Sequence, residues 1–164
     1  MTDAFVPDAD YQVFATVSEY RLAVNAVIRS ANSNVYVFDT DLVDIALDDV
    51  VRYELLRTFL ASGTARRLWV LLRDIQYLQQ RAARMQKLMR DFSRQIEIRQ
   101  VAGPRETDAF IYNDAGVCLY RPQCGHVKSI LTYRDVSRCR LFAGRFGLMF
   151  DVAEQSVSST TLGL

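Results

Sequence analysis

Two acidic residues, Asp39 and Asp41, directly follow an apolar run that is typical of a buried strand. Carboxylates two residues apart can hold Mg²⁺ or orient a substrate hydroxyl, and open α/β sheets place ligands at the carboxyl ends of their strands. Aspartates in such loops also cap turns, and the turn preferences of Asp favour this second interpretation. If a site exists, we expect this loop to form its floor, with Thr107 and Asp108 beside it.

A second candidate is the pair His126 and Lys128, which contains the only histidine of the chain. A histidine can attack phosphorus, and a lysine can neutralise the phosphate oxygens. The nearest acid downstream of the pair is Asp135, nine residues after His126, and Tyr133 stands seven residues after the histidine. A loop histidine beside a glycine is more often solvated, and short motif matches mislead without structural context. A phosphodiesterase or other hydrolase using His126 and Lys128 is therefore an alternative.

The three cysteines, Cys118, Cys124 and Cys139, could form a zinc site with His126. Structural zinc needs four ligands in tetrahedral arrangement, usually supplied as close pairs, and this chain has no Cys-x-x-Cys pair. We therefore predict ordinary reduced thiols, with no metal and no cofactor. Reduced cysteines are typical of a cytoplasmic protein.

A long amphipathic helix is predicted over residues 75–93, and its polar arc is strongly basic. Such an arc can follow a phosphate backbone or an anionic membrane. No aromatic residue is interleaved on that arc for base stacking, so a solvated face is favoured. A nucleic-acid-binding module remains an alternative, although nucleic acid is not the expected partner. The basic residues are Arg81, Arg84, Lys87, Arg90 and Arg94.

Length and charge set limits on what the chain can be. Its 164 residues are enough for one domain with a real core, and 20 basic against 19 acidic residues leave a net charge of +1. No global field therefore draws the molecule to nucleic acid or membranes. We expect no membrane insertion, since no apolar run is long enough to span a bilayer, and the acidic start of the chain does not read as a signal peptide. Residues 1–15 are expected to be a loosely attached leader with a short strand at 11–14.

Alternating helical and strand patterns follow the leader. Thr16 and Glu19 have the spacing of a capping box and open the first helix, and apolar β-branched and aromatic runs mark the strands. The order predicts an α-β-α sandwich whose first three strands are parallel, with helices on both faces and a late antiparallel hairpin in the same mixed sheet. The expected elements are a helix over 16–31, strand 35–39, helix 48–62, strand 67–73, helix 75–93, strand 96–101, hairpin 107–122, strand 127–133 and helix 135–154.

This layout resembles one half of a phospholipase D-like domain over roughly residues 18–164. The segments that carry the resemblance are SANSNVYVFDTDL, LLRTFLASGTARRLWVLLRD and FSRQIEIRQV, followed by the hairpin and the closing helix. In that family the strand after the third segment carries His-x-Lys-x-x-x-x-Asp. The same pattern here falls on Thr107, Ala109 and Asp114, so only the aspartate is retained. Threonine cannot replace the imidazole nucleophile, and alanine cannot neutralise the phosphate.

The resemblance therefore implies a non-catalytic domain that works as a ligand-binding, scaffolding or regulatory module. Single halves of the family commonly pair, which implies a homodimer with the hairpin near the interface. We expect Phe142, Phe146 and Phe150, on the last helix, to be exposed and to fill that interface. An anionic or phosphate-containing ligand is expected, and Arg105, Arg121 and Arg134 are candidates for an anion pocket. The full set of ligand-binding candidates is Asp39, Asp41, Thr107, Asp108, Asp114, Arg121 and His126.

Overall fold

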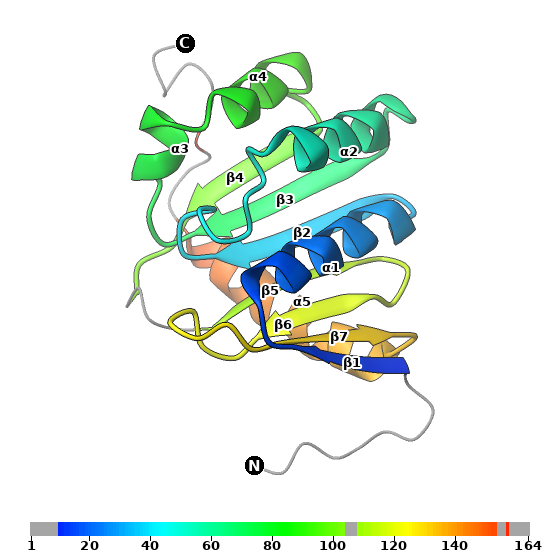
Figure 1. The fold of residues 1–164 in the computed structure, drawn as a ribbon. Coiled ribbons are helices and arrows are strands. Elements are labelled where there is room, and N and C mark those ends of the chain that lie inside the picture. The colour runs from blue at the N-terminus through cyan, green and yellow to red at the C-terminus, as the bar shows by residue number, and fades with distance from the viewer. Residues whose placement is uncertain (1–9, 104–107, 154–156, 158–164) are drawn as a thin grey trace.

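A computed structural model describes residues 10–103, 108–153 and 157 of the chain. Twelve helices and strands lie in these residues, and Figure 1 shows them as one sheet covered by helices on both sides. In chain order they are β1 (Asp10–Phe14), α1 (Val17–Ser30), β2 (Asn34–Asp39), α2 (Val50–Ala61), β3 (Arg67–Leu72), α3 (Gln76–Gln80), α4 (Ala83–Asp91), β4 (Ile96–Gln100), β5 (Ala109–Asn113), β6 (Cys118–Arg121), β7 (Ser129–Tyr133) and α5 (Val136–Val152).

The sheet is mixed and has the strand order β1-β7-β6-β5-β2-β3-β4. Strands β2, β3 and β4 run parallel, with a crossover helix between neighbours, whereas β5, β6 and β7 continue the sheet as an antiparallel meander. The predicted fold class and the parallel and antiparallel halves of the sheet are thus confirmed. The expected N-cap is present as well, because Oγ1 of Thr16 accepts the backbone N–H of Glu19 at 3.1 Å.

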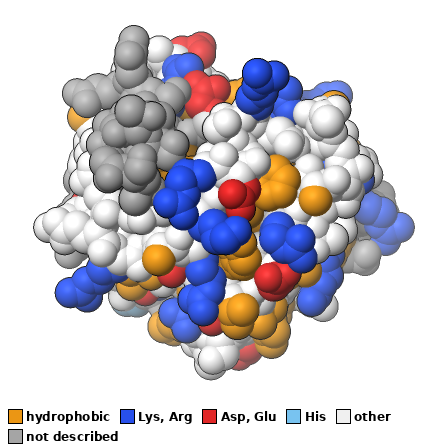
Figure 2. Space-filling view, turned by 90° about the horizontal axis from the view of Figure 1, so that it is seen from above, with side chains coloured by type: hydrophobic (Ala, Val, Ile, Leu, Met, Phe, Trp, Pro, Cys, Tyr) orange, Lys and Arg blue, Asp and Glu red, His pale blue; other side chains and the backbone are white. Residues whose placement is uncertain are grey.

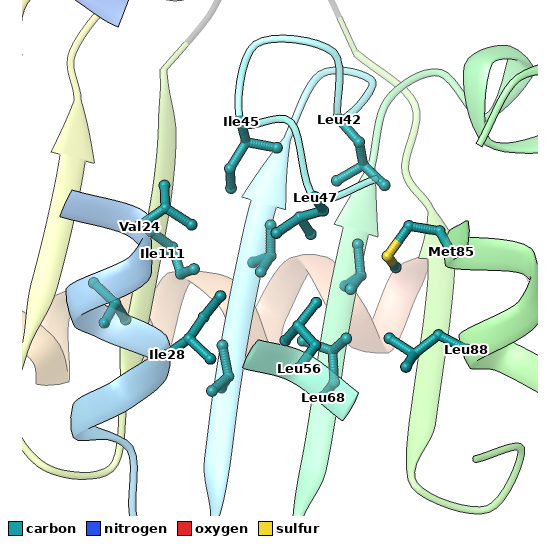
Figure 3. Packing of buried hydrophobic residues seen from close by; sticks show 14 of the residues in the cluster. Val24, Ile28, Leu42, Ile45, Leu47, Leu56, Leu68, Met85, Leu88 and Ile111 are labelled. Atoms are coloured by element: carbon teal, nitrogen blue, oxygen red, sulfur yellow. The ribbon is translucent and has the colours of Figure 1, made fainter. Parts of the chain in front are cut away.

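One face of the sheet carries the larger core, under α1, α2, α3 and α4. Figure 3 shows Leu56 of α2 and Leu88 of α4 packed on the strands, with α5 on the far side of the sheet. The loop between β2 and α2 contributes fully buried Leu42, Ile45 and Leu47 to the same core. Burial of three large apolar side chains holds this loop against the sheet, and the loop is therefore part of the core.

The second core lies between the other face of the sheet and α5, the only helix of the described residues on that face. Phe142, Phe146 and Phe150 are buried there, packed on aromatic rings of the strands such as Phe110 and Tyr36. The prediction that these three phenylalanines fill a dimer interface is wrong. Their spacing on one helical face is as expected, but that face covers the chain's own sheet.

The single helix predicted over residues 75–93 is also wrong, because the chain breaks at Arg81 and Ala82 into α3 and α4. A side chain of α4 compensates for the interrupted backbone hydrogen bonds. Nε2 of Gln86 donates to the carbonyl oxygens of Leu78 and Gln79 (2.8 and 2.9 Å). These bonds satisfy carbonyl groups that a helix end leaves open.

Both ends of the described chain are tied to the sheet. Residues 10–14 of the expected leader form β1, which pairs with β7 at one edge, while residues 1–9 lie outside the described part. At the other edge the N–H of Val157 donates to the carbonyl oxygen of Ile98 in β4 (2.7 Å), and Val157 is buried in the larger core. Among the helices of the described residues, none has the length and apolarity to cross a membrane.

Candidate functional site

The carboxyl ends of β2 and β3 lie beside the start of β5 and the end of β6. These strand ends form one end of the sheet, which is here called the carboxyl edge. Phe38 of β2 pairs with Phe110 of β5, and Ala109 pairs with Arg121. The position before Ala109 is therefore adjacent to Asp39, as the sequence predicted for Asp108. Thr107 itself lies outside the described residues. Ligands of open α/β sheets bind at such an edge.

Asp39 is buried at this edge, with 3% of its surface exposed. The pKa of its carboxyl group is raised to about 6, mainly by burial and to a lesser extent by the neighbouring charges of Asp41 and Asp44, while hydrogen bonds from backbone N–H groups oppose the rise. One of these donors is Leu42 (3.0 Å), whose φ of 74° is unusual for a residue with a side chain. Asp39 thus has a structural role in holding a strained loop.

Asp41 lies on the same loop and accepts the N–H of Val43 at 3.0 Å, which is an Asx turn. Asp39, Asp41 and Cys124 line a small hollow of about 230 Å³ at the carboxyl edge. Oγ1 of Thr40 donates to Sγ of Cys124 at 3.6 Å across it. The two predicted aspartates therefore line the same hollow, but each already accepts a hydrogen bond from a backbone N–H of its own loop.

Arg73 follows β3 directly and is the least satisfied cation of the carboxyl edge. Its guanidinium lies over the ring of Phe38, 4.3 Å from the centroid, and its Nε and Nη1 atoms are buried without a hydrogen-bond partner in the described residues. Burial lowers the pKa of Arg73, while Asp108 acts in the opposite direction. Buried donors of a charged group are normally paired, so this side chain has capacity for an acceptor from outside the described chain.

The other two arginines of the edge already have acidic partners. Arg145 of α5 forms a two-pronged ion pair with Asp108, with Nη2 2.6 Å from Oδ1. Arg121 is buried, and its Nη1 lies 2.8 Å from Oδ2 of Asp44. Its Nε donates to the carbonyl oxygen of His126 at 2.9 Å. Arg121, a predicted ligand residue, therefore anchors the loop after β6.

His126 and Lys128 lie on that loop with exposed side chains. Within the described residues, neither side chain has a hydrogen bond or an ion pair, and no acid is placed to orient the imidazole. The structure thus brings His126 to the carboxyl edge without an activating partner. General base or nucleophilic chemistry needs such a partner to set tautomer and pKa.

Asp114 lies at the opposite end of the sheet, in the turn between β5 and β6. Its carboxylate accepts the N–H groups of Asn32 and Ser33 at 2.8–3.1 Å, which ties the hairpin to the loop before β2. Arg134 also lies at this end, next to Gly116 of the same turn. Its Cα atom would be 3.7 Å from the Cβ of a larger residue at position 116. The predicted pocket of Arg105, Arg121 and Arg134 is therefore wrong, because Arg121 and Arg134 end on opposite edges; Arg105 lies outside the described residues.

Two cysteines are joined in a disulfide, so the prediction of three reduced thiols is wrong for Cys118 and Cys139. Cys118 of β6 and Cys139 of α5 both face the second core, with Cα atoms 6.1 Å apart, a separation that suits a disulfide. Cys124 is free and half-buried at the carboxyl edge. The residues described by the structure include no group of three or more His, Cys, Asp or Glu side chains that could hold a metal ion.

The basic residues of the predicted third helix are exposed on α4 and on the residues flanking it. Figure 2 shows Lys and Arg side chains gathered on the face of the molecule that includes α4, with acidic side chains among them. Lys87 is paired with Asp91 at 2.7 Å, and Arg84 reaches the carbonyl oxygen of Asp48 at 3.4 Å. The basic residues thus remain exposed although the helix is broken, but Lys87 and Arg84 already have partners within the chain.

Sequence reasoning missed Arg73 and Arg145 as members of the site. Arg73 carried a usable signal, because it is the first residue after a buried strand whose carboxyl end lies beside Asp39. Arg145 carried none, since only the packing of α5 across the sheet brings it to Asp108.

The fold defines the class of protein as an α/β domain with the phospholipase D-like fold. Similar solved structures are Nuc from Salmonella typhimurium, a phospholipase D family member (TM-score 0.62, 11% identity, covering 92% of this chain and 99% of that one), and NucT from Helicobacter pylori (TM-score 0.63, 12% identity, 90% and 99%). TrmBL2, an archaeal chromatin protein that shows a novel mode of DNA binding, is similar with a TM-score of 0.68 and 13% identity over 91% of this chain. This chain corresponds to 56% of TrmBL2.

Residues 16–162 match the family described as a domain of unknown function, DUF7931, and the chain belongs to that family. No curated protein matches the sequence.

Proposed function

We propose that this chain is a non-catalytic phospholipase D-like domain that binds an anionic, phosphate-containing ligand at the carboxyl edge. The observation that carries the proposal is the half-buried side chain of Arg73, whose buried Nε and Nη1 atoms have no acceptor within the described residues. A phosphate oxygen would supply one, because guanidinium and phosphate form strong charge-assisted hydrogen bonds. The thiol of Cys124 and the hydroxyl of Thr40 stand on the same edge.

The absence of catalysis is supported by the residues that the family pattern places on the hairpin. Ala109 stands at the position of the family's lysine and is fully buried on β5. Thr107 stands at the position of the histidine. A carboxyl edge that has the open donors of Arg73 but neither of these groups can hold a phosphate but lacks the nucleophile.

Binding is tested by isothermal titration with inorganic phosphate and with dimethyl phosphate. Arg73→Gln should weaken binding about tenfold, the effect expected for one charge-assisted hydrogen bond. Arg66→Gln is the matched control, because Arg66 also stacks on a phenylalanine, 5.2 Å from the Phe59 ring centroid, but lies at the other end of β3. Equal binding by both variants and the unaltered chain would reject the site.

Catalysis is tested separately with bis(para-nitrophenyl) phosphate. We expect no turnover by the unaltered chain. Turnover that is lost in His126→Ala and Lys128→Ala would overturn the non-catalytic proposal in favour of a phosphodiesterase using these exposed residues.

A nucleic-acid-binding module is the second candidate, and the exposed arc on α4 favours it together with the DNA binding of TrmBL2. Contacts to phosphates would make binding fall steeply with salt concentration. Salt-sensitive binding of duplex DNA that is lost in the double variant Arg84→Glu and Lys87→Glu would support this function. Loss of DNA binding in Arg73→Gln alone would assign it to the carboxyl edge.

A homodimer and a cytoplasmic location are further proposals taken from the resemblance and the sequence.

A further inference from the structure

A groove of about 720 Å³ lies between α5 and the hairpin end of the sheet, on the edge opposite Arg73. Its walls carry aromatic and small side chains: Tyr36 and Tyr112 of the sheet on one side, and Ala143, Phe146 and Gly147 of α5 on the other. Arg140 and Asp114 stand among the lining residues. A hollow of this size, largely apolar with a few polar groups, is typical of small-molecule sites. It lies outside the carboxyl-edge site, and its occupant does not depend on the proposal made for that site.

The tyrosines limit what the groove can accept. The ring of Tyr36 is sandwiched between Tyr112 (centroids 4.6 Å apart, planes at 6°) and Trp69 (6.3 Å, 8°). Both faces of Tyr36 are thus covered, which leaves its edge and hydroxyl for the groove. Aromatic edges are electropositive, and cations prefer faces. The arrangement therefore disfavours a cationic ligand and suits an electron-rich ring or an anionic group.

The polar groups agree with this preference. The hydroxyls of Tyr36 and Tyr112 have no hydrogen bond to any described residue and are not sealed from solvent, so they are free to donate. Arg140 is exposed and has no ion pair within the described chain. The carboxylate of Asp114, in contrast, is already covered by the backbone N–H groups of Asn32 and Ser33. Asp114 keeps its negative charge, but its oxygens are occupied by these N–H groups, whereas the guanidinium donors of Arg140 remain available to an acid.

We propose that this groove binds a small aromatic acid, with its ring between the tyrosine edges and α5 and its acidic group at Arg140. Gly147 lines the groove, and a Cβ built on it meets nothing within 4 Å, so a large side chain at this position has room to fill the groove. The same open space surrounds Gly144 on the same helix, which does not line the groove. The two glycines provide a matched pair of positions for blocking the groove without disturbing the core.

The probe for the experiment is 1-anilinonaphthalene-8-sulfonate, an aromatic acid, compared with the uncharged N-phenyl-1-naphthylamine. Binding is followed by the dye's own fluorescence and by that of Trp69, the only tryptophan of the chain and a neighbour of Tyr36. Gly147→Leu should weaken dye binding at least about tenfold, whereas Gly144→Leu leaves it unchanged. Arg140→Gln should weaken the sulfonate about fivefold to tenfold and leave the uncharged dye unaffected.

Equal effects of Gly147→Leu and Gly144→Leu would mean that the dye adsorbs elsewhere, and the proposal fails. Insensitivity of the sulfonate to Arg140→Gln would overturn the assignment of an acid. If dye binding is absent while Gly147→Leu converts a dimer into a monomer, the groove belongs to a second copy of the chain, which also overturns the proposal. Thermal unfolding of each variant verifies that it is folded.

Discussion

At the scale of single residues, the carboxyl group of Asp39 is buried and forms no ion pair within the described residues. Burial raises its pKa from 3.8 to about 6, so the folded state resists ionisation. Below pH 3.8 the group is neutral in both states and its stabilising contribution is complete. Between pH 3.8 and 6 the unfolded chain ionises first, and that contribution is lost. A shift of this size corresponds to roughly 3 kcal/mol above pH 6.

Asp39→Asn should therefore raise the free energy of unfolding by about 2–3 kcal/mol at pH 8 and by almost nothing near pH 4. The amide oxygen can still accept the N–H of Leu42, which preserves the loop. Urea unfolding at a series of pH values measures the difference. A variant that is less stable by the same amount at every pH would show that the carboxylate is needed for its geometry alone.

The residues of the site were predictable to different degrees, for physical reasons. Asp39 could be placed at this edge because it ends a buried strand, and Asp108 because it begins a strand of the predicted antiparallel hairpin; β5 does run antiparallel to β2, which brings the two positions together. The ion pair of Arg121 with Asp44 could not be foreseen, since it depends on how the loop after β2 packs against a residue 77 positions later in the chain. Sequence patterns report which side chains are polar, but the partner that a buried charge finds is decided by tertiary packing.

At the scale of elements, the hairpin between β5 and β6 is organised by a buried amide that sequence reasoning passed over. Nδ2 of Asn113 donates to the carbonyl oxygen of Val27 (2.8 Å) and to Oγ of Ser30 (2.9 Å). Its Oδ1 accepts the N–H groups of Ala115 and Val117 (2.8 and 3.2 Å). Asn113 thus joins the turn to α1, with two hydrogen bonds to the helix and two within the turn.

Asn113→Ala should lower the free energy of unfolding by about 3 kcal/mol, because it leaves buried donors and acceptors without partners. Chemical denaturation measures the change. Asn32→Ala is the control, since Asn32 is exposed on the neighbouring loop and contributes only its backbone N–H. A loss below about 1 kcal/mol in Asn113→Ala would mean that water replaces the amide.

The break between α3 and α4 rests on Gln86, which bonds two carbonyl groups at the end of α3. We expect Gln86→Ala to reduce the free energy of unfolding by about 1–2 kcal/mol. Gln79→Ala is the comparison, because Gln79 is exposed and only its carbonyl group takes part. If both variants unfold alike in urea, the break is held by the apolar packing of Ala82 instead.

Helices and strands were predicted correctly where local sequence determines the backbone conformation, and were missed where side-chain contacts determine it. The N-cap at Thr16 and the alternation of strands with crossover helices follow from local chemistry and handedness. Helical periodicity continues through Ala82 in the sequence, so the break becomes visible only in the structure, where Gln86 bonds back to the end of α3. For Phe142 the pattern gave the correct helical face, but a periodic apolar face looks the same whether it covers a sheet or a partner.

At the scale of the whole molecule, the proposed homodimer must form without the phenylalanines of α5, which are buried within the chain. Light scattering coupled to gel filtration should give twice the mass of the chain at micromolar concentration. Phe146→Ala should then destabilise the fold by about 3–5 kcal/mol, as expected for a core position, without a separate effect on association. A monomeric mass would contradict the dimer and leave the fold assignment intact.

The hydrogen bond between Val157 and Ile98 bears on solubility. β4 is an edge strand, and an open edge is a template for strands of other molecules. The N–H of Val157 donates to the carbonyl oxygen of Ile98, the central residue of β4, and the side chain of Val157 is buried in the larger core. A strand from another molecule would first have to displace Val157. Val157→Pro, which lacks the donated N–H, should therefore scatter more light on mild heating than Val157→Ala. The residue that closes the edge of the sheet is then also what keeps neighbouring molecules from joining it.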